Sequence, residues 1–314
     1  MLDTFLATLS AMLVMFSCIA VGFVLRKLRI VPENTATVLS KLELNVFLPA
    51  QMLVTFINYC TVDSIVAQGD TVLYGLVFAA LAVGLAFPVS RLFSKQVDER
   101  NIYRYSLFIA NMGFLGNAIV PQIMGQEALY SYLLFGLPIQ VVLFAWAINW
   151  LIPQGRGEGK SLWKRILNPT LVAILGGAVL GLCGVGKVLP GFVDTSLRNL
   201  SGCMGPVAMV LTGFIIGGYS VPSLLKNKKV YAVTFLRLFV LPAVSVAVVV
   251  LLGADKTVAQ LTLIAAGTAL GLNTVVVPAA YDGDTHAGAA MAMVSHIGAV
   301  ISIPLLYALL TYIL

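Results

Sequence analysis

The chain alternates between long apolar runs and short polar connections over almost its whole length. A helix needs about 20 mostly apolar residues to cross the hydrocarbon core of a bilayer. The strands of a membrane β-barrel would be far shorter and would alternate between apolar and polar residues. The pattern therefore predicts an all-α membrane protein with ten transmembrane helices over residues 4–25, 38–58, 71–90, 105–124, 128–152, 169–186, 203–222, 230–252, 258–280 and 287–313.

The composition agrees with this interpretation. Hydrophobic residues make up 60% of the chain and charged residues only 10%, whereas a soluble domain has roughly a quarter of its residues charged. A water-soluble fold of this size could not bury so much apolar surface. The net charge of +6 is therefore no sign of nucleic-acid binding, and it has to be interpreted connection by connection.

Most of the 19 Lys and Arg residues flank the odd-numbered connections between predicted helices. Positive charge marks the cytoplasmic side of a membrane protein, so both termini are predicted to be extracytoplasmic, in a multi-pass protein of the plasma (inner) membrane. The ninth connection, YDGDTHAG, is acidic and departs from this rule. The basic residues of the other four are Arg26, Lys27, Arg29 and Lys41; Arg91, Lys95, Arg100 and Arg104; Arg156, Lys160, Lys164 and Arg165; and Lys226, Lys228 and Lys229.

Features of the first half of the chain recur in the second half at a nearly constant distance in sequence. Two halves with an odd number of spans each are inverted copies of one another, an arrangement that is typical of secondary transporters. We therefore expect a first inverted repeat over 1–152, a short cytoplasmic connector over 153–168 and a second inverted repeat over 169–314. The matching offsets are 158 residues (Pro32 to Pro190), 157 (Pro49 to Pro206 and Thr55 to Thr212) and 156 (Asn117 to Asn273).

The fourth and ninth predicted helices contain residues that disfavour a plain helix. The fourth holds NMGFLGNAIVP over 111–121, and the ninth holds GTALGLNTVVVP over 267–278. Proline has no N–H, so Pro121 frees the carbonyl of Asn117, and Pro278 frees that of Thr274. Irregular backbone at membrane depth is tolerated only inside protein or along a wet cavity. We expect both helices to be broken and to cross, with the first break between Gly116 and Pro121.

The crossing is the predicted substrate site. Half-helix N-termini present free N–H groups and a positive dipole end, which favour an anion such as a carboxylate. The alternatives are helices that are merely kinked and polar side chains that bond only between helices. The predicted substrate-binding residues are Asn111, Gly113, Gly116, Asn117, Pro121, Gly271, Asn273, Thr274 and Pro278 at the crossing, Gln51 and Thr55 on the second span, Gln140 on the fifth and His296 on the tenth.

Two ionisable groups lie within predicted spans and have alternative interpretations. His296 is either a titrating, proton-coupling group or a neutral side chain bonded to a neighbouring helix. Arg237 either extends toward the polar end of its span or pairs with Asp282 or Asp284 as a gate. The acidic segment DGDTH is interpreted as a solvated turn, and no metal site is expected there.

Several stretches resemble the auxin efflux carrier family in their order and spacing. This family includes plant auxin exporters and bacterial malate or malonate permeases. The resemblance implies two inverted five-helix bundles with broken, crossing fourth and ninth helices that transport small organic acids. Family members often carry proline where this chain has Ala118 and Ala269, which displaces the expected crossing by about one turn. The stretches are GFVLRKLRIVPENTATVLSKLELNVFLPA, NMGFLG, TFLRLFVLP and AAYDGDTHAGAAMAMVSHIGAVISIPLLYALL.

The predicted function is secondary transport of a small carboxylate, such as malate, malonate, a 2-oxo acid or an auxin-like acid, by alternating access. A channel or a membrane-embedded sensor is the alternative. A membrane enzyme is not favoured, because HExxH and GxSxG motifs are absent, and the absence of a Walker motif argues against ATP hydrolysis. No cofactor is expected, and the expected partners are the substrate and the lipid bilayer. Homodimer formation, the coupling ion and the direction of transport are left open.

Overall fold

The computed structural model describes residues 1–153, 168–279 and 283–314, and every regular element within them is helical. Wide π-helical turns are η1, η2 and η5, and 3-10 turns are η3 and η4. The elements are α1 (Leu2–Lys27), α2 (Thr35–Leu42), η1 (Glu43–Phe47), α3 (Leu48–Tyr59), α4 (Val62–Ala67), α5 (Gly69–Ser90), α6 (Val97–Phe108), η2 (Met112–Gly116), α7 (Asn117–Met124), α8 (Gln126–Ala145), η3 (Ala147–Leu151), α10 (Pro169–Leu182), η4 (Val185–Lys187), α11 (Gly191–Gly217), α12 (Val221–Leu224), α13 (Lys228–Phe235), η5 (Leu236–Val240), α14 (Leu241–Leu251), α15 (Lys256–Gly267), α16 (Asn273–Ala279) and α17 (His286–Ile313).

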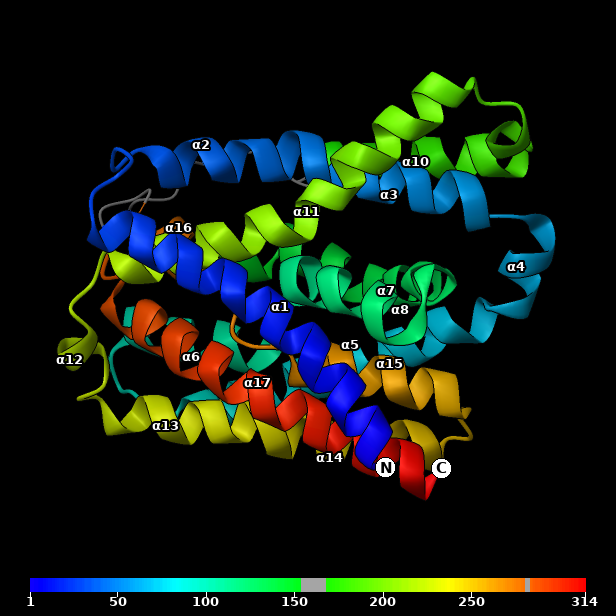
Figure 1. Cartoon of the computed structure of the whole chain (residues 1–314). Helices are drawn as coiled ribbons and strands as arrows, with labels where there is room; N and C mark the ends of the chain where they lie inside the picture. Colours follow the sequence, from blue (N-terminus) through cyan, green and yellow to red (C-terminus); the bar gives the residue numbers. More distant parts are fainter. Residues whose placement is uncertain (154–167, 280–282) are drawn as a thin grey trace.

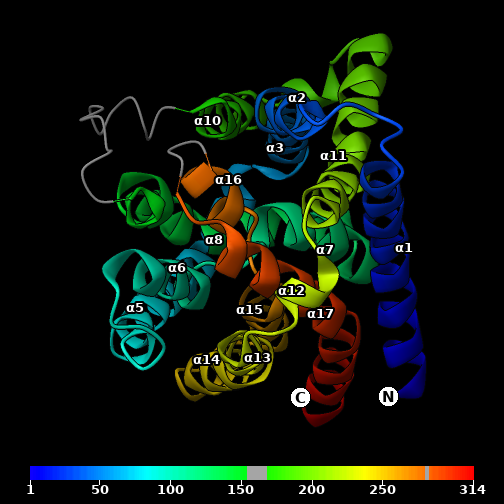
Figure 2. The ribbon, with the colours of Figure 1, turned by 90° about the vertical axis from the view of Figure 1, so that its left-hand side faces the viewer.

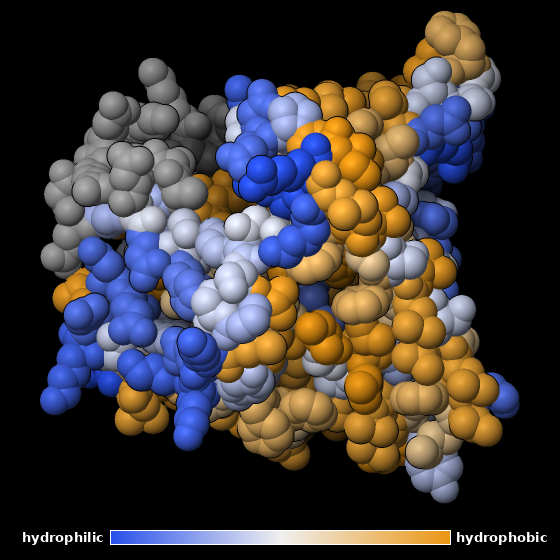
Figure 3. Space-filling model, turned by 60° about the vertical axis from the view of Figure 1, so that its left-hand side comes forward, coloured by the Kyte–Doolittle hydropathy of each residue, from blue (hydrophilic) through white to orange (hydrophobic). Residues whose placement is uncertain are grey.

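Six helical segments in the described part of the chain are long and apolar enough to cross a membrane. They are α1, α5, α8, α11, α17 and the continuous segment Lys228–Leu251, and the shorter segments Met112–Met124 and Pro169–Leu182 are also apolar. Large apolar side chains such as Leu73, Val172 and Leu305 are exposed on these helices. Figure 3 shows apolar residues covering one side of the molecule while hydrophilic residues gather on the other. The prediction of an all-α membrane protein is confirmed.

The helices form two groups with the crossing segments between them (Figures 1 and 2). One group contains α1, α3, α10 and α11, the other contains α5, α6, α8, α13, α14 and α15, and α17 packs both on α1 and on α13 and α15. The segments α7 and α16 lie between the groups. The two termini lie together at one end of the molecule, whereas the connection from α1 to α2 and the segment α12 lie at the opposite end.

Two helical segments are interrupted at the places that bring the groups together. The chain leaves helical geometry after α6 and resumes it at Met112, and it does so again between α15 and α16. The predicted break between Gly116 and Pro121 is wrong, because Pro121 lies inside α7. The freed carbonyl of Asn117 accepts a hydrogen bond from Gln51 Nε2 at 3.3 Å instead. The helix can therefore continue through the proline.

Two of the three π-helical turns directly precede a Leu-Pro pair. Pro49 lies in the first turn of α3 after η1, and Pro242 lies in the first turn of α14 after η5. Because proline lacks an N–H and its ring clashes with an earlier carbonyl, a helix that continues through it has to widen or bend. Wide turns of this kind are frequently found at functional sites.

The group of α1, α3, α10 and α11 is held together by close backbone contacts at glycines. A Cβ atom on Gly22 of α1 would collide with the carbonyl oxygen of Val210, and a Cβ atom on Gly213 of α11 would collide with that of Ile19. Gly181 of α10 meets the backbone of α3 in the same way. Small residues allow membrane helices to approach closely where no hydrophobic effect drives their association.

We therefore expect the substitutions Gly22→Ala and Gly213→Ala to lower the free energy of unfolding by roughly 1–3 kcal/mol, because the added methyl group forces two backbones apart. The melting temperature of the purified protein in detergent measures the effect. The control is Gly84→Ala, since a Cβ atom at this exposed position meets nothing within 4 Å. Equal melting temperatures for all three variants would contradict the close packing of α1 on α11.

Candidate functional site

The two interrupted segments cross and bond to each other through their backbones. Ala110 and Leu270 form an isolated antiparallel β-bridge. The N–H of Asn111 donates to the carbonyl of Ala269 at 2.7 Å, and the N–H of Leu270 donates to Ser295 Oγ of α17 at 2.9 Å. Backbone groups that leave a helix at membrane depth need such partners, because no water or lipid group replaces them there.

A histidine on α17 holds the side chain of Asn111 at the crossing. His296 Nε2 lies 3.3 Å from Asn111 Nδ2, and His296 Nδ1 lies 2.7 Å from the carbonyl oxygen of Ala292. A neutral imidazole with its hydrogen on Nδ1 satisfies both contacts, since Nδ1 donates to the carbonyl and Nε2 accepts from the amide. This geometry favours the interpretation of His296 as a neutral side chain that positions Asn111.

A cavity of about 170 Å3 adjoins the crossing. This volume corresponds to about six water molecules at roughly 30 Å3 each. Its walls are mostly apolar, with a few polar groups, which is typical of small-molecule sites. Six of the predicted residues line it, namely Asn111, Gly113, Asn117, Gln140, Gly271 and Asn273.

Three polar residues of the cavity wall were not predicted from the sequence. Thr170 lies in the first turn of α10, and Tyr105 and Tyr132 are fully buried on α6 and α8. Asn273 Nδ2 donates to the hydroxyl of Tyr105 at 2.8 Å. The hydroxyl of Tyr132 lies directly against Gly116, where any side chain would displace it. The two tyrosines could have been identified from their positions within predicted spans, because a tyrosine hydroxyl needs a polar partner when it is buried.

The other predicted binding residues do not line this cavity. Gly116 and His296 contact lining residues, as described above. Thr274 Oγ1 donates to the carbonyl of Gly271 at 3.0 Å, and the buried side chain of Gln51 reaches the carbonyl of Asn117. Thr55 is buried on α3, while Pro121 and Pro278 lie within α7 and α16. These residues shape the crossing rather than the cavity wall.

Arg237 does not form the predicted gate with Asp284. Arg237 does not extend to the polar end of its span, because its side chain is completely buried. Its Nη1 donates to the carbonyl of Leu107 at 2.9 Å, in the last turn of α6 before the break. Asp284 is exposed and accepts the N–H of His286 at 2.9 Å. Asp282 lies outside the described residues.

Arg237 remains without a counter-charge among the described residues. Its Nε and Nη2 atoms are buried and have no hydrogen-bond partner there. Arg237 lies within electrostatic range of the neutral Tyr132, which lines the cavity. A buried cation without an anionic partner creates a positive potential in its surroundings, and apolar walls screen it little. The side of the cavity near Tyr132 therefore favours negative charge.

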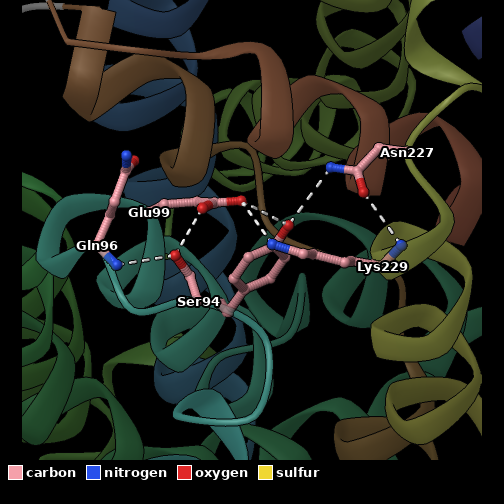
Figure 4. Close-up of polar contacts among 6 residues, drawn as sticks. Ser94, Gln96, Glu99, Asn227 and Lys229 are labelled. Carbon is pink, nitrogen blue, oxygen red and sulfur yellow. Dashed lines mark hydrogen bonds and ion pairs between the residues drawn. The ribbon is translucent and has the colours of Figure 1, made fainter.

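A second polar cluster joins the first turn of α6 to the start of α13 (Figure 4). Glu99 accepts hydrogen bonds from Ser94 Oγ at 2.6 Å and from the hydroxyl of Tyr103 at 3.1 Å. Lys229 Nζ of α13 lies 3.7 Å from the same carboxylate, and Asn227 Nδ2 donates to Tyr103 at 3.5 Å. These contacts hold α6 against the start of α13. Leu107, whose carbonyl accepts the hydrogen bond from Arg237, lies in the last turn of the same helix.

Comparison with known proteins identifies relatives over most of the chain. A family model described as membrane transport protein matches residues 7–159 and 158–307. An uncharacterized transporter of Methanothermobacter thermautotrophicus is 24% identical over 217 residues, which cover 68% of this chain and 69% of that protein. The family match confirms the resemblance to the auxin efflux carriers.

We expect Ser295→Ala to destabilise the crossing. This substitution leaves the buried N–H of Leu270 without a partner, which typically costs about 1–3 kcal/mol, and it should lower the melting temperature in detergent. Ser302→Ala on the same helix is the matched control, because Ser302 is equally buried but its hydroxyl has no partner in the described structure. If both variants melt like the unmodified protein, Ser295 does not support the crossing.

Proposed function

The chain belongs to the family of membrane transport proteins, and we propose that it carries small carboxylates, such as malate, malonate, a 2-oxo acid or an auxin-like acid, as a secondary transporter. The observation that carries this proposal is the cavity at the crossing of the two interrupted helices. Interrupted helices that meet at the membrane midplane are the usual site of substrate binding in secondary transporters.

The chemistry of the cavity supports a carboxylate over a neutral or cationic substrate. The first N–H groups of a helix have no partner within it, and the segment that begins at Met112 starts at the cavity. Its positive dipole end favours an anion. Asn111, Asn117 and Gln140 add amide donors, and Arg237, which has no counter-charge among the described residues, lies within electrostatic range of Tyr132. No acidic side chain lines the described cavity.

The proposed architecture is ten spans in two inverted repeats of five, over 1–152 and 169–314. The packing of helices supports it, because α1 packs on α11 as α10 packs on α3, and glycines mediate both contacts. The two matches to the family model also meet at residues 158–159, inside the proposed connector 153–168. Residues 154–167 of that connector lie outside the described structure.

The proposed orientation places both termini on the extracytoplasmic side of the plasma membrane. The connection from α1 to α2 and the segment α12 lie at the end opposite the termini. Basic residues of these connections, such as Arg26 and Lys229, would then lie in the cytoplasm, as positive charge generally does.

The proposed mechanism is alternating access, in which the two helix groups move against each other around the crossing. Transport that saturates and shows counterflow is expected of such a carrier. A channel or a sensor, the second candidate, would show neither property. No enzymatic activity is proposed.

A side chain at Gly113 is expected to block transport without disturbing the fold. Gly113 lines the cavity, and a Cβ atom there meets nothing within 4 Å. In Gly113→Leu the side chain would occupy the space of the substrate, so counterflow of labelled malate, malonate, 2-oxo acids and indole acids in proteoliposomes should fall about tenfold or more, the effect of roughly 1.4 kcal/mol of lost binding.

The matched control is Gly84→Leu, which adds the same side chain at an exposed glycine of α5 with equally free space. It should transport like the unmodified protein. If Gly113→Leu melts normally and transports every substrate at the unmodified rate, the crossing cavity is not the binding site.

The charge of Arg237 is expected to determine the preference for anions. Arg237→Met retains a long buried side chain without charge, and should reduce counterflow of a dicarboxylate about tenfold, whereas Arg237→Lys should retain more activity because it keeps the charge. The comparison is made on protein of equal melting temperature. Equal dicarboxylate transport by the Met and Lys variants would show that this charge plays no part in substrate selection.

A further inference from the structure

Glu43 is the one acidic side chain among the described residues that is completely buried. Neither of its carboxylate oxygens has a hydrogen-bond partner in that part of the structure. An ionised carboxylate that is buried without a partner carries a large desolvation cost. Ionisable residues at membrane depth are rare for this reason, and they mark substrate pathways or proton relays.

The helices packed against Glu43 supply no cation to neutralise it. Its turn, η1, packs against α2, α3, α10 and α11, and α10 contains no titratable residue. Lys41 of α2 is exposed and lies two positions away, so it does not share the face of Glu43. Asp194 and Arg198 of α11 pair with each other at 2.7 Å. The remaining titratable groups of these helices, Tyr59 at the end of α3 and Cys203 of α11, carry no positive charge.

The residue after Glu43 lies at two cavities, although Glu43 itself lines neither of them. The next residue, Leu44, lines the crossing cavity and also a cavity of about 620 Å3. This second cavity is lined by Arg26 and Glu33, which form an ion pair at 3.0 Å in which the Glu33 side chain is 87% exposed. Exposure of the buried Glu43 carboxyl group to either cavity would therefore require a movement of η1.

We propose that Glu43 is the binding site of a proton whose movement is coupled to substrate transport, an inference that rests on the transport function proposed above. The carboxyl group is protonated while it is buried. It releases this proton when movement of the helix groups exposes it, and it takes up a proton again before it is buried. Each transport cycle moves one proton, and the carboxyl group is never ionised while it is buried.

Other candidates for the coupling site are less suitable. His296 is a buried ionisable group at the crossing, but both of its ring nitrogens are engaged in a neutral arrangement. A metal cation would need several oxygen or nitrogen ligands. The described residues contain no group of three or more His, Cys, Asp or Glu side chains that could hold one, so a cation there would have to be bound by backbone carbonyl, amide and hydroxyl oxygens.

The test compares the unmodified protein with Glu43→Gln in proteoliposomes by two assays. Counterflow without any gradient measures substrate binding and movement. Accumulation under a gradient of one pH unit, imposed in each direction in turn, measures proton coupling and should change about tenfold in one direction for one coupled proton. Gln resembles the permanently protonated carboxyl group, so Glu43→Gln should keep counterflow and lose the response to the gradient. Uptake by liposomes without protein is subtracted.

Two further variants complete the design. Glu43→Asp keeps a carboxyl group and should keep a response to the pH gradient, while Lys41→Gln, at the exposed neighbouring position, should behave like the unmodified protein. The proposal is wrong if the unmodified protein shows counterflow but ignores the pH gradient, if a sodium gradient drives accumulation instead, or if Glu43→Gln responds to the pH gradient as fully as the unmodified protein does. Absence of counterflow in the unmodified protein would contradict the transport function itself.

Discussion

The structure depends on one constraint, which is that backbone groups released from a helix at membrane depth need partners within the protein. The chain meets this constraint by pairing its two interruptions with each other. The bond from the Asn111 N–H to the Ala269 carbonyl and the bridge between Ala110 and Leu270 make each broken helix the support of the other. Since these residues are far apart in sequence, the crossing joins the two halves of the chain. Ser295 and His296 then complete the crossing from α17.

Charged side chains within the membrane are also expected to need partners inside the protein. Arg237 and Glu43 are both completely buried, and each lies in a π-helical turn that precedes a Leu-Pro pair. The proline changes the local helix, and the wide turn changes which side chains face the interior. Burying either charge has a cost that apolar residues would avoid. The proposed functions of the two residues, selection of an anion and binding of a proton, account for their retention at these depths.

The sequence was sufficient for the fold class and for the location of the crossing, because both depend on local patterns. Apolar runs indicate membrane helices, and the Gly- and Asn-rich stretches around 111–121 and 267–278 indicate interruptions. It did not predict the position of the first helix break, which lies before Met112 rather than beside Pro121. Pro121 is accommodated because Gln51, which lies 66 residues before Asn117, donates a hydrogen bond to the freed carbonyl of Asn117. Such long-range partners leave no trace in local periodicity.

The same argument explains why Glu43 was missed as an interior acid. It falls near the start of a predicted span, where a carboxylate would ordinarily reach water, and it is buried where α2, α3, α10 and α11 pack around η1. That packing belongs to the glycine-mediated group of α1, α3, α10 and α11, in which backbones touch and leave little freedom. Movement between the helix groups would therefore occur at their boundary, where Leu44 faces the crossing cavity and Gln51 reaches Asn117. In the proposed movement, Glu43, one residue from that boundary, would respond to it while the closely packed helices around it moved together.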